Sequence, residues 1–329
     1  MAVRKNVKRK AELSKKDLLG LYTSMLRIRK VEEALMEVFS AGEIPGFLHV
    51  CVGQEAAPAA VCGLLNPDDY IGTTHRGHGH VLAKGIDLKL FMAELFGKKN
   101  GFCLGRSGSM HLADKNLGIL GANGIVGGGI PITTGAALAA QYKYPKRVSI
   151  CFFGDGTTDQ GTFYECLNMA SLWKLPIVYV CENNGWAQFT PQKVHAANTD
   201  VTAKAACHDM PTVTVPNDVL KIHKAADAAI KRARKGGGPT LVEVKCNRWH
   251  GHYVGDAQKY REKKSMEQAR KDDCLVKFEN ELVKRKLLTK TVKAGLDKQL
   301  SREIADSIDF ARTSPLPDPS ELKEGLYVD

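Results

Sequence analysis

Short apolar runs separated by helical segments constrain the fold of this chain more than any other feature. Residues 148–153 and 177–181 are almost entirely apolar, and shorter runs follow at 212–215 and 241–244. Helical patterns lie between them, at residues 162–173 and 218–235. Strands that are apolar on both faces are typical of parallel sheets covered by crossover helices. The pattern predicts an α/β fold with a mostly parallel sheet and helices on both faces.

The rest of the chain fits one large domain. Its 329 residues are ample for a hydrophobic core. Further helices are expected over residues 16–40, 54–65 and 88–96, with Ser14 and Asp87 as caps of the first and third. The small-residue run 130–142 predicts a buried helix, and the last 70 or so residues look helical and charged. We expect a basic tail (1–16), a main domain (17–265) and a C-terminal helical extension of it (266–329).

Charge and cysteine usage exclude several classes of protein. The net charge is +11, and seven Lys and Arg but only one acid lie in residues 1–16. A nucleic-acid-binding arm is one reading of that tail, but no nucleic-acid motif supports it, so we favour a solvated arm. No apolar run is long enough to span a membrane. The nine cysteines form no CxxC pair. They are expected as buried thiols in a reducing compartment, the cytoplasm.

Polar residues follow two of the predicted strands at their carboxyl ends. Gly154-Asp155-Gly156 ends the first, and Asn183-Asn184 ends the second after 26 intervening residues. In an open parallel sheet these ends lie at one edge, where ligands bind. Asp155 and Asn184 offer the oxygen ligands that Mg²⁺ prefers, and Mg²⁺ usually completes its shell with phosphate oxygens and water. The pairing predicts a magnesium and diphosphate site.

The same pairing matches the thiamine diphosphate fingerprint, and the chain resembles the α subunits of 2-oxo acid dehydrogenase complexes. The resemblance implies a thiamine diphosphate-binding fold and covers roughly residues 20–265. Residues 74–80 and 252–256 look most like acetoin dehydrogenase α subunits, with pyruvate dehydrogenase α subunits second. The matching segments include Gly53-Gln54-Glu55-Ala56, His75-Arg76-Gly77-His78-Gly79, Gly108-Ser109-Met110-His111, Ala122-Asn123-Gly124-Ile125-Val126-Gly127, residues 153–160, Trp173-Lys174-Leu175-Pro176 and Arg248-Trp249-His250-Gly251-His252.

The resemblance implies roles for individual residues. Those around the cofactor are Asp155, Asn184 and the Trp186 carbonyl for Mg²⁺, Gly156, Thr157, Arg76 and His75 for the diphosphate, and Gly124 and Val126 for the two rings. His75 replaces a tyrosine common in the pyruvate enzymes. His252 is expected to contact the cofactor and to donate a proton in acyl transfer, while Phe47 and His49 would line the substrate pocket. The roles of His78 and His250 stay open. Tyr253 stands where animal relatives carry a regulatory serine.

The resemblance also implies what the chain works with. Thiamine diphosphate supplies a nucleophile and electron sink, but it needs a glutamate that this chain is too short to provide. A β subunit is therefore expected to complete an α₂β₂ assembly. The reaction implied is cleavage of acetoin next to its carbonyl, with transfer of the acetyl group to lipoamide on an acyltransferase core. Decarboxylation of pyruvate is the alternative, and nucleic-acid binding through the tail is the lower one.

Overall fold

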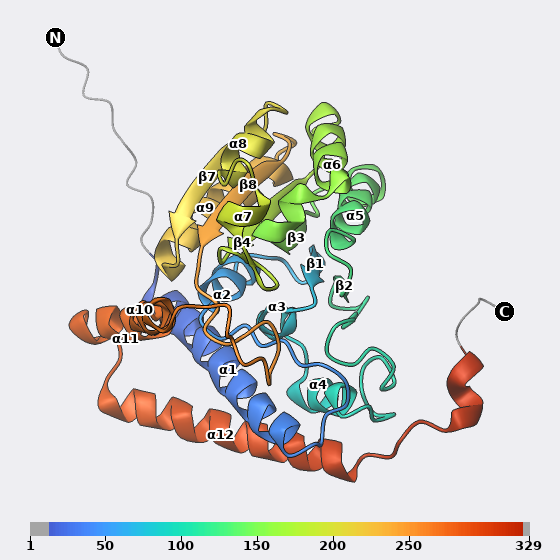
Figure 1. Cartoon of the computed structure of the whole chain (residues 1–329), viewed down its shortest axis with the longest axis vertical. Helices are drawn as coiled ribbons and strands as arrows, with labels where there is room; N and C mark the ends of the chain where they lie inside the picture. Colours follow the sequence, from blue (N-terminus) through green and yellow to red (C-terminus); the bar gives the residue numbers. More distant parts are fainter. Residues whose placement is uncertain (1–12, 325–329) are drawn as a thin grey trace.

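The computed structural model describes residues 13–324, which form a six-stranded main sheet wrapped by helices (Figure 1). The main strands are β1 (Tyr70–Thr74), β2 (Ile119–Asn123), β3 (Ser149–Gly154), β4 (Ile177–Asn183), β7 (Thr212–Pro216) and β8 (Thr240–Lys245). All six are parallel, in the order β2-β1-β3-β4-β8-β7. The two-residue strands β5 (Trp186–Ala187) and β6 (Thr190–Pro191) form a separate hairpin.

Helices precede, connect and follow the strands. Those of the first half are α1 (Lys15–Ser40), α2 (Ala56–Cys62), α3 (His78–Lys84), α4 (Leu88–Leu95), α5 (Gly129–Lys143) and α6 (Gly161–Leu172). Those of the second half are α7 (Gln192–His195), α8 (Val201–Ala206), α9 (Val219–Arg234), α10 (Lys263–Lys271), α11 (Cys274–Lys284) and α12 (Lys290–Thr313). Short 3₁₀ helices span Asp155–Asp159 and Pro319–Lys323.

The central strands are apolar throughout because both faces of the sheet are covered. Alternate β4 residues enter two different cores. Val178 and Val180 pack with the α1, α2 and α9 side chains, whereas Tyr179 and Cys181 pack with those of α5, α6 and α8. The two-layer cover confirms the predicted α/β architecture. Over the described part of the chain, no helix combines the length and the apolar character that a membrane span requires.

Helix boundaries largely follow the local signals in the sequence. The Ser14 side chain accepts from Asp17 N, and Asp87 accepts from Lys89 N and Leu90 N, so both predicted caps are confirmed. Helix α1 begins at Lys15, which makes Lys15 and Lys16 part of a helix rather than of the tail. Residues 1–12 of the predicted tail lie outside the described residues. The division of the chain at residue 265 stays a prediction.

Two expectations about elements need correction. The sequence pattern does not predict strands β1 and β2, because each contains a glycine that breaks the apolar run. At Gly72 in β1 a Cβ would lie 2.0 Å from Thr133 Oγ1 on α5, so the close helix packing excludes a side chain. Helix α5 is expected to be buried, yet one of its faces is open to solvent, with Ile132 52% and Tyr142 80% exposed.

Candidate functional site

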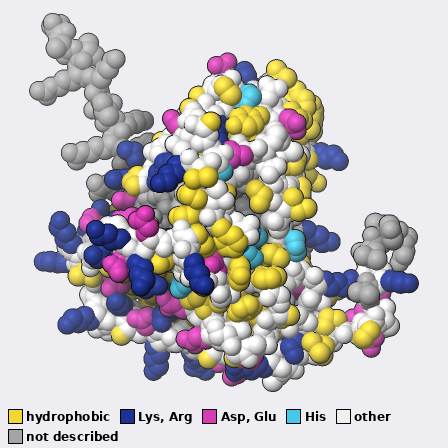
Figure 2. All heavy atoms as spheres, viewed as in Figure 1, with side chains coloured by type: hydrophobic (Ala, Val, Ile, Leu, Met, Phe, Trp, Pro, Cys, Tyr) yellow, Lys and Arg dark blue, Asp and Glu magenta, His cyan; other side chains and the backbone are white. Residues whose placement is uncertain are grey.

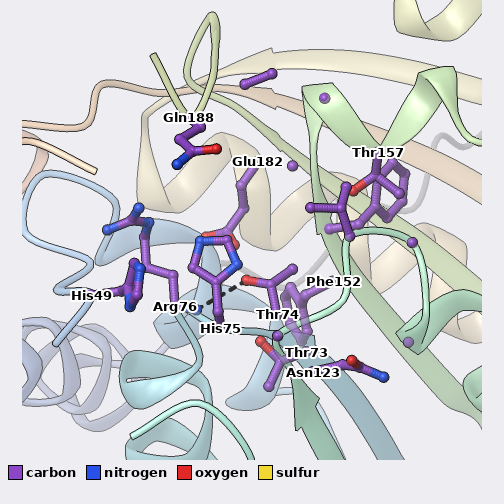
Figure 3. A pocket seen from close by; sticks show the side chains of 18 of the residues that line it. His49, Thr73, Thr74, His75, Arg76, Asn123, Phe152, Thr157, Glu182 and Gln188 are labelled. Atoms are coloured by element: carbon purple, nitrogen blue, oxygen red, sulfur yellow. Dashed lines mark hydrogen bonds between the residues drawn. The ribbon is translucent and has the colours of Figure 1, made fainter. Parts of the chain in front are cut away.

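A cavity of about 480 Å³ opens at the carboxyl ends of the parallel strands. Strands β1 and β3 are neighbours in the sheet. The chain continues from β1 to β2 on one side of this pair and from β3 to β4 on the other, so the strand order reverses between β1 and β3. Ligands in open α/β sheets bind at such a switch point. Residues from four strand ends meet here, as Figure 3 shows for part of the wall. They include Thr74, His75 and Arg76 at the end of β1, Asn123, Gly124 and Val126 at the end of β2, Gly154, Gly156 and Thr157 at the end of β3, and Asn184 and Trp186 after β4.

The corner between β3 and β4 holds a buried carboxylate with a free oxygen. Asp155 is 0% exposed, and its Oδ1 accepts from Asn184 N at 3.3 Å. Its Oδ2 has no hydrogen-bond partner among the described residues. Burial raises the pKa of Asp155. An ionised oxygen in this position is costly unless a cation compensates it, so the residues fit a metal ion.

Asn184 is held ready beside that carboxylate. Its Oδ1 accepts from Trp186 N at 3.2 Å, and its Nδ2 donates to Gln54 Oε1 at 2.9 Å. This Asx turn holds the amide oxygen beside the Trp186 backbone, and both residues line the cavity. Gln54 belongs to one of the segments that carry the resemblance, but the sequence assigns it no role in the site. It lies far from Asn184 in the chain, and only the packing of the segment before α2 brings it here.

Glycines keep the walls of this corner close together. A Cβ on Gly156 would lie 2.7 Å from the Ala187 Cβ of the β5–β6 hairpin. At Gly124 a Cβ would approach His111 Cε1 to 3.2 Å. Thr157 is buried and lines the cavity beside Gly156, and Val126 stands 49% exposed at its rim. All positions predicted for cofactor contacts except Asp155 line this cavity, and Asp155 lies in the chain between Gly154 and Gly156, which do.

Two buried guanidinium groups give the cavity a positive field. Arg76 is 7% exposed, and it donates to Val50 O at 2.7 Å and to His252 O at 2.9 Å. Burial lowers its pKa to about 10, with a further contribution from Arg248. Arg248 is 2% exposed and donates to Tyr260 Oη at 3.0 Å. Such a pair favours an anionic ligand such as a diphosphate.

Arg248 is a second site residue that the sequence does not reveal. The segment that contains it attracts attention for its histidines. No local sequence pattern indicates that an arginine soon after a strand will be buried. Its Nε has no hydrogen-bond partner in the described part of the chain, although the side chain lines the cavity. A buried donor without a partner indicates a ligand-binding residue, and only the tertiary structure shows that Arg248 has one.

Three imidazoles meet beside the arginines. The ring centroids of His49, His75 and His252 lie 4.7 to 5.2 Å apart in pairs. Burial lowers the pKa of His49 to about 3 and that of His252 to about 4, and the Arg76 charge adds to both effects. The pKa of His75 is also lowered, first by burial and then by Arg76. The three rings are therefore neutral at pH 7 in the ligand-free chain.

The loop after β8 is tied down by one carboxylate. Asp256 accepts from His252 N at 2.7 Å and from Tyr260 Oη at 2.6 Å. These bonds hold the His252 ring over the cavity, between His75 and Phe189. Phe47, expected at the substrate pocket together with His49, does not line this cavity. It stands 57% exposed and packs edge-on against Tyr253 at 5.4 Å.

Two further histidines do not reach the cavity. His78 is fully buried, with Nδ1 2.9 Å from Glu32 Oε2 and Nε2 2.8 Å from Ser109 Oγ. This network joins α1, α3 and the loop before β2, which gives His78 a structural place. His250 is half-buried, and its backbone carbonyl accepts from Arg261. Neither is among the cavity-lining residues of the described chain.

The histidine cluster predicts a pH dependence of stability. A histidine whose pKa is lower in the folded chain than the unfolded value of about 6.5 stabilises the fold above that pH. The stabilisation is lost as the pH falls from about 6.5 toward about 4. We expect the melting temperature of the ligand-free chain to fall over this window. The His49→Gln variant should show a shallower fall, whereas His111→Gln, at an exposed position outside the cluster, should follow the wild type. Parallel melting curves for all three would contradict the prediction.

Comparison with known proteins agrees with this geometry. The family described as "Dehydrogenase E1 component" matches residues 23–320. The α subunit of the acetoin:2,6-dichlorophenolindophenol oxidoreductase of Bacillus subtilis is 46% identical, covering 96% of this chain and 95% of that protein. Its counterpart from Cupriavidus necator is 42% identical over 96% of both chains. The pyruvate dehydrogenase E1 component α subunit of Rhizobium meliloti is 38% identical, covering 97% of this chain and 92% of its own. The match spans nearly the whole chain, and this chain belongs to the dehydrogenase E1 component family.

Proposed function

We propose that the chain is the α subunit of a thiamine diphosphate-dependent acetoin dehydrogenase. Two of its relatives are named as α subunits of acetoin oxidoreductases, at 46% and 42% identity. The observation that carries the proposal is the corner formed by Asp155 and Asn184, at the ends of β3 and β4. Its buried, unpartnered carboxylate oxygen and the two neighbouring guanidinium groups fit a magnesium diphosphate.

Different residues around the cavity would bind different parts of the cofactor. Asp155, Asn184 and the Trp186 carbonyl would hold Mg²⁺. Gly156, Thr157, Arg76 and His75 would hold the diphosphate, joined by Arg248. Gly124 and Val126 would face the rings. When bound, thiamine diphosphate supplies the nucleophilic carbon and the electron sink of the reaction.

His252 is proposed to hold and move a proton at the reacting end of the cavity. Its ring is neutral in the ligand-free chain because burial and Arg76 lower its pKa. A diphosphate beside it would favour the protonated form and raise that pKa toward the working pH. His49 lies within contact of both His75 and His252 and would shape the substrate side of the cavity. Phe47 lies outside the cavity and packs against Tyr253. We propose that it contributes to the substrate pocket only as part of the outer rim.

An exposed apolar face supports a partner subunit beside this cavity. Ile125 and Val126, 74% and 49% exposed, stand at the cavity rim. The face continues over α5 and α6 through Ile132, Tyr142, Leu172 and Trp173, which are 42% to 80% exposed. Hydrophobic side chains gather along the side of the molecule where α5 and α6 lie (Figure 2). An exposed apolar surface of this kind marks a protein interface, and we propose that the β subunit covers it in an α₂β₂ assembly.

The overall reaction proposed is cleavage of acetoin by oxidised lipoamide. Acetaldehyde leaves, and the acetyl group is transferred to one lipoamide sulfur while the other becomes a thiol. The lipoamide would be carried by an acyltransferase core. Decarboxylation of pyruvate is the second candidate, because pyruvate dehydrogenase α subunits are also among the relatives, at 34% to 38% identity. The cysteines are free throughout and mostly buried, which supports a reducing compartment, and we place the enzyme in the cytoplasm.

Reconstitution tests the proposal directly. The purified chain alone, with thiamine diphosphate and Mg²⁺, should show no acetoin-dependent reduction of dichlorophenolindophenol. Adding the matching β subunit should restore turnover, since the carboxylic acid that activates the cofactor is expected from that subunit. In a panel of acetoin, pyruvate and branched-chain 2-oxo acids, acetoin should give the highest kcat/KM. Robust turnover by the isolated chain, or a preference for pyruvate, would contradict the corresponding part of the proposal.

A further inference from the structure

A second cavity, of about 810 Å³, lies between α9 and α11. We call it the α9–α11 cavity. Its floor includes Pro216 and Lys245, the last residues of β7 and β8. It therefore opens at the same edge of the sheet as the first cavity, but at the outer end of the strand order (Figure 1). The carboxyl edge of a parallel sheet is where ligands bind in this class of fold.

The wall of the α9–α11 cavity carries an excess of positive charge. Its cations are Lys221, Lys224, Lys245, Lys277 and Arg285, and Lys245 already pairs with Glu243 at 2.6 Å. The three acids in the wall are already engaged. Asp218 caps α9 by accepting from Leu220 N and Lys221 N, Asp272 pairs with Lys277, and Glu281 pairs with Arg285 at 2.7 Å. Lys221 and Lys224, in the first two turns of α9, form no ion pair with any described residue.

Asn217 lines the cavity, and the oxygen of its buried side-chain amide accepts no hydrogen bond from the described residues. Asn217 is 5% exposed, and its Nδ2 donates to Gly53 O at 2.8 Å, which fixes the orientation of the amide. Its Oδ1 has no partner in the described part of the chain. Leaving such an acceptor buried and unpaired costs free energy, which a ligand with an N–H or O–H group would recover.

The inner wall beside Asn217 is apolar. Val219, Cys246, Cys274 and Phe278 are each buried and line the cavity. The ligand must therefore combine an anionic end, a hydrogen-bond donor and an apolar body. The volume is within the range of pockets that enclose drug-sized molecules.

We propose that the α9–α11 cavity binds a nucleoside phosphate. The phosphates would meet Lys221 and Lys224, a base or sugar donor would meet Asn217 Oδ1, and the base would lie against Cys246 and Phe278. The site is distinct from the proposed cofactor site, although the two are close, because neighbouring residues Gly53 and Gln54 each contact one of them. Gly53 accepts from Asn217, while Gln54 accepts from Asn184 at 2.9 Å in the first cavity. Binding here does not depend on the reaction that the first cavity performs.

Calorimetric titration with adenosine diphosphate tests the proposal. The full chain is first saturated with thiamine diphosphate and Mg²⁺, so that the first cavity does not compete for the probe. One equivalent of adenosine diphosphate is expected to bind, at least about 10-fold more tightly than inorganic pyrophosphate, because pyrophosphate lacks the apolar body and the donor. The variant K221Q/K224Q should lose at least about 10-fold in affinity. The control K231Q/K235Q, which removes two lysines at the other end of α9, should bind as the wild type does.

Three outcomes would overturn the proposal. The first is no binding of adenosine diphosphate at millimolar concentration. The second is equal affinity in K221Q/K224Q and in the wild type. The third is equal affinity for pyrophosphate, which would remove Asn217 and the apolar wall from recognition.

Discussion

Replacing Asp155 with asparagine is expected to weaken Mg²⁺-dependent binding of thiamine diphosphate by at least about 100-fold. The amide side chain would retain the shape of the carboxylate but would remove the charge that the cation needs. Changes one shell further from a metal already cost about 10- to 100-fold in affinity, so loss of a direct ligand should cost more. Isothermal titration of the chain with the cofactor, with and without Mg²⁺, measures the effect.

A neighbouring carboxylate on the same 3₁₀ helix provides the control. Asp159 pairs with His195 at 2.5 Å and with Lys204 at 3.1 Å, at the edge of the site. The Asp159→Asn variant should bind the cofactor as the wild type does. Unchanged affinity in Asp155→Asn would show that the metal does not bind in this corner.

The stability of the same variant distinguishes a lost ligand from a damaged fold. Asp155 is fully buried, and its Oδ2 has no partner among the described residues. The nearest histidine nitrogen, His195 Nε2, is 3.9 Å from that oxygen. Removing a buried charge that is compensated this weakly should leave the melting temperature of the ligand-free chain unchanged or raise it. A lower melting temperature together with weaker binding would attribute the loss of affinity to unfolding.

Replacing His252 with alanine should separate binding from turnover. The Arg76 contact to this residue is made to its backbone carbonyl, so the alanine variant keeps it. Cofactor affinity should therefore change by less than about 10-fold, whereas acetyl transfer to lipoamide should slow by about 10² to 10⁴-fold, the range of general acid–base catalysis. Single-turnover acetylation of lipoamide by the reconstituted enzyme measures this step.

His250 serves as the matched control. It is two residues away, half-buried and outside the first cavity, and its contact with Arg261 is also made through the backbone. The His250→Ala variant should transfer acetyl groups at the wild-type rate. If His252→Ala instead lost most of its cofactor affinity with an unchanged transfer rate, His252 would be a binding residue and not a proton donor.

Local sequence signals predict much of this molecule. Continuous apolar runs mark β3 and β4, because strands covered on both faces need no polar alternation. The caps Ser14 and Asp87 mark helix starts, because their side chains satisfy free N–H groups of the first turn. The pairing of Asp155 with Asn184 is predictable as well, since adjacent parallel strands end at one edge.

Other elements have no local signal. Strand β1 contains Gly72, which is required by the approach of Thr133 from α5, a residue 61 positions later in the chain. The exposed face of α5 cannot be recognised from the sequence, because small and apolar residues are equally suited to a helix buried in the core and to one that lies at a subunit interface. Phe47 is expected at the substrate pocket beside His49, but the backbone directs it outward against Tyr253.

The order of residues along the chain was sufficient for the fold class, for the caps and for placing Asp155 and Asn184 at one edge of the sheet, because each depends on neighbours in sequence or on adjacent strands. Tertiary packing decided the rest. It placed Gln54 against Asn184, buried Arg248 in the wall of the cavity, and brought His49, His75 and His252 from three separate segments into one cluster. These features depend on distance and burial between remote segments, and the same packing decides the charge of the histidines by removing them from water.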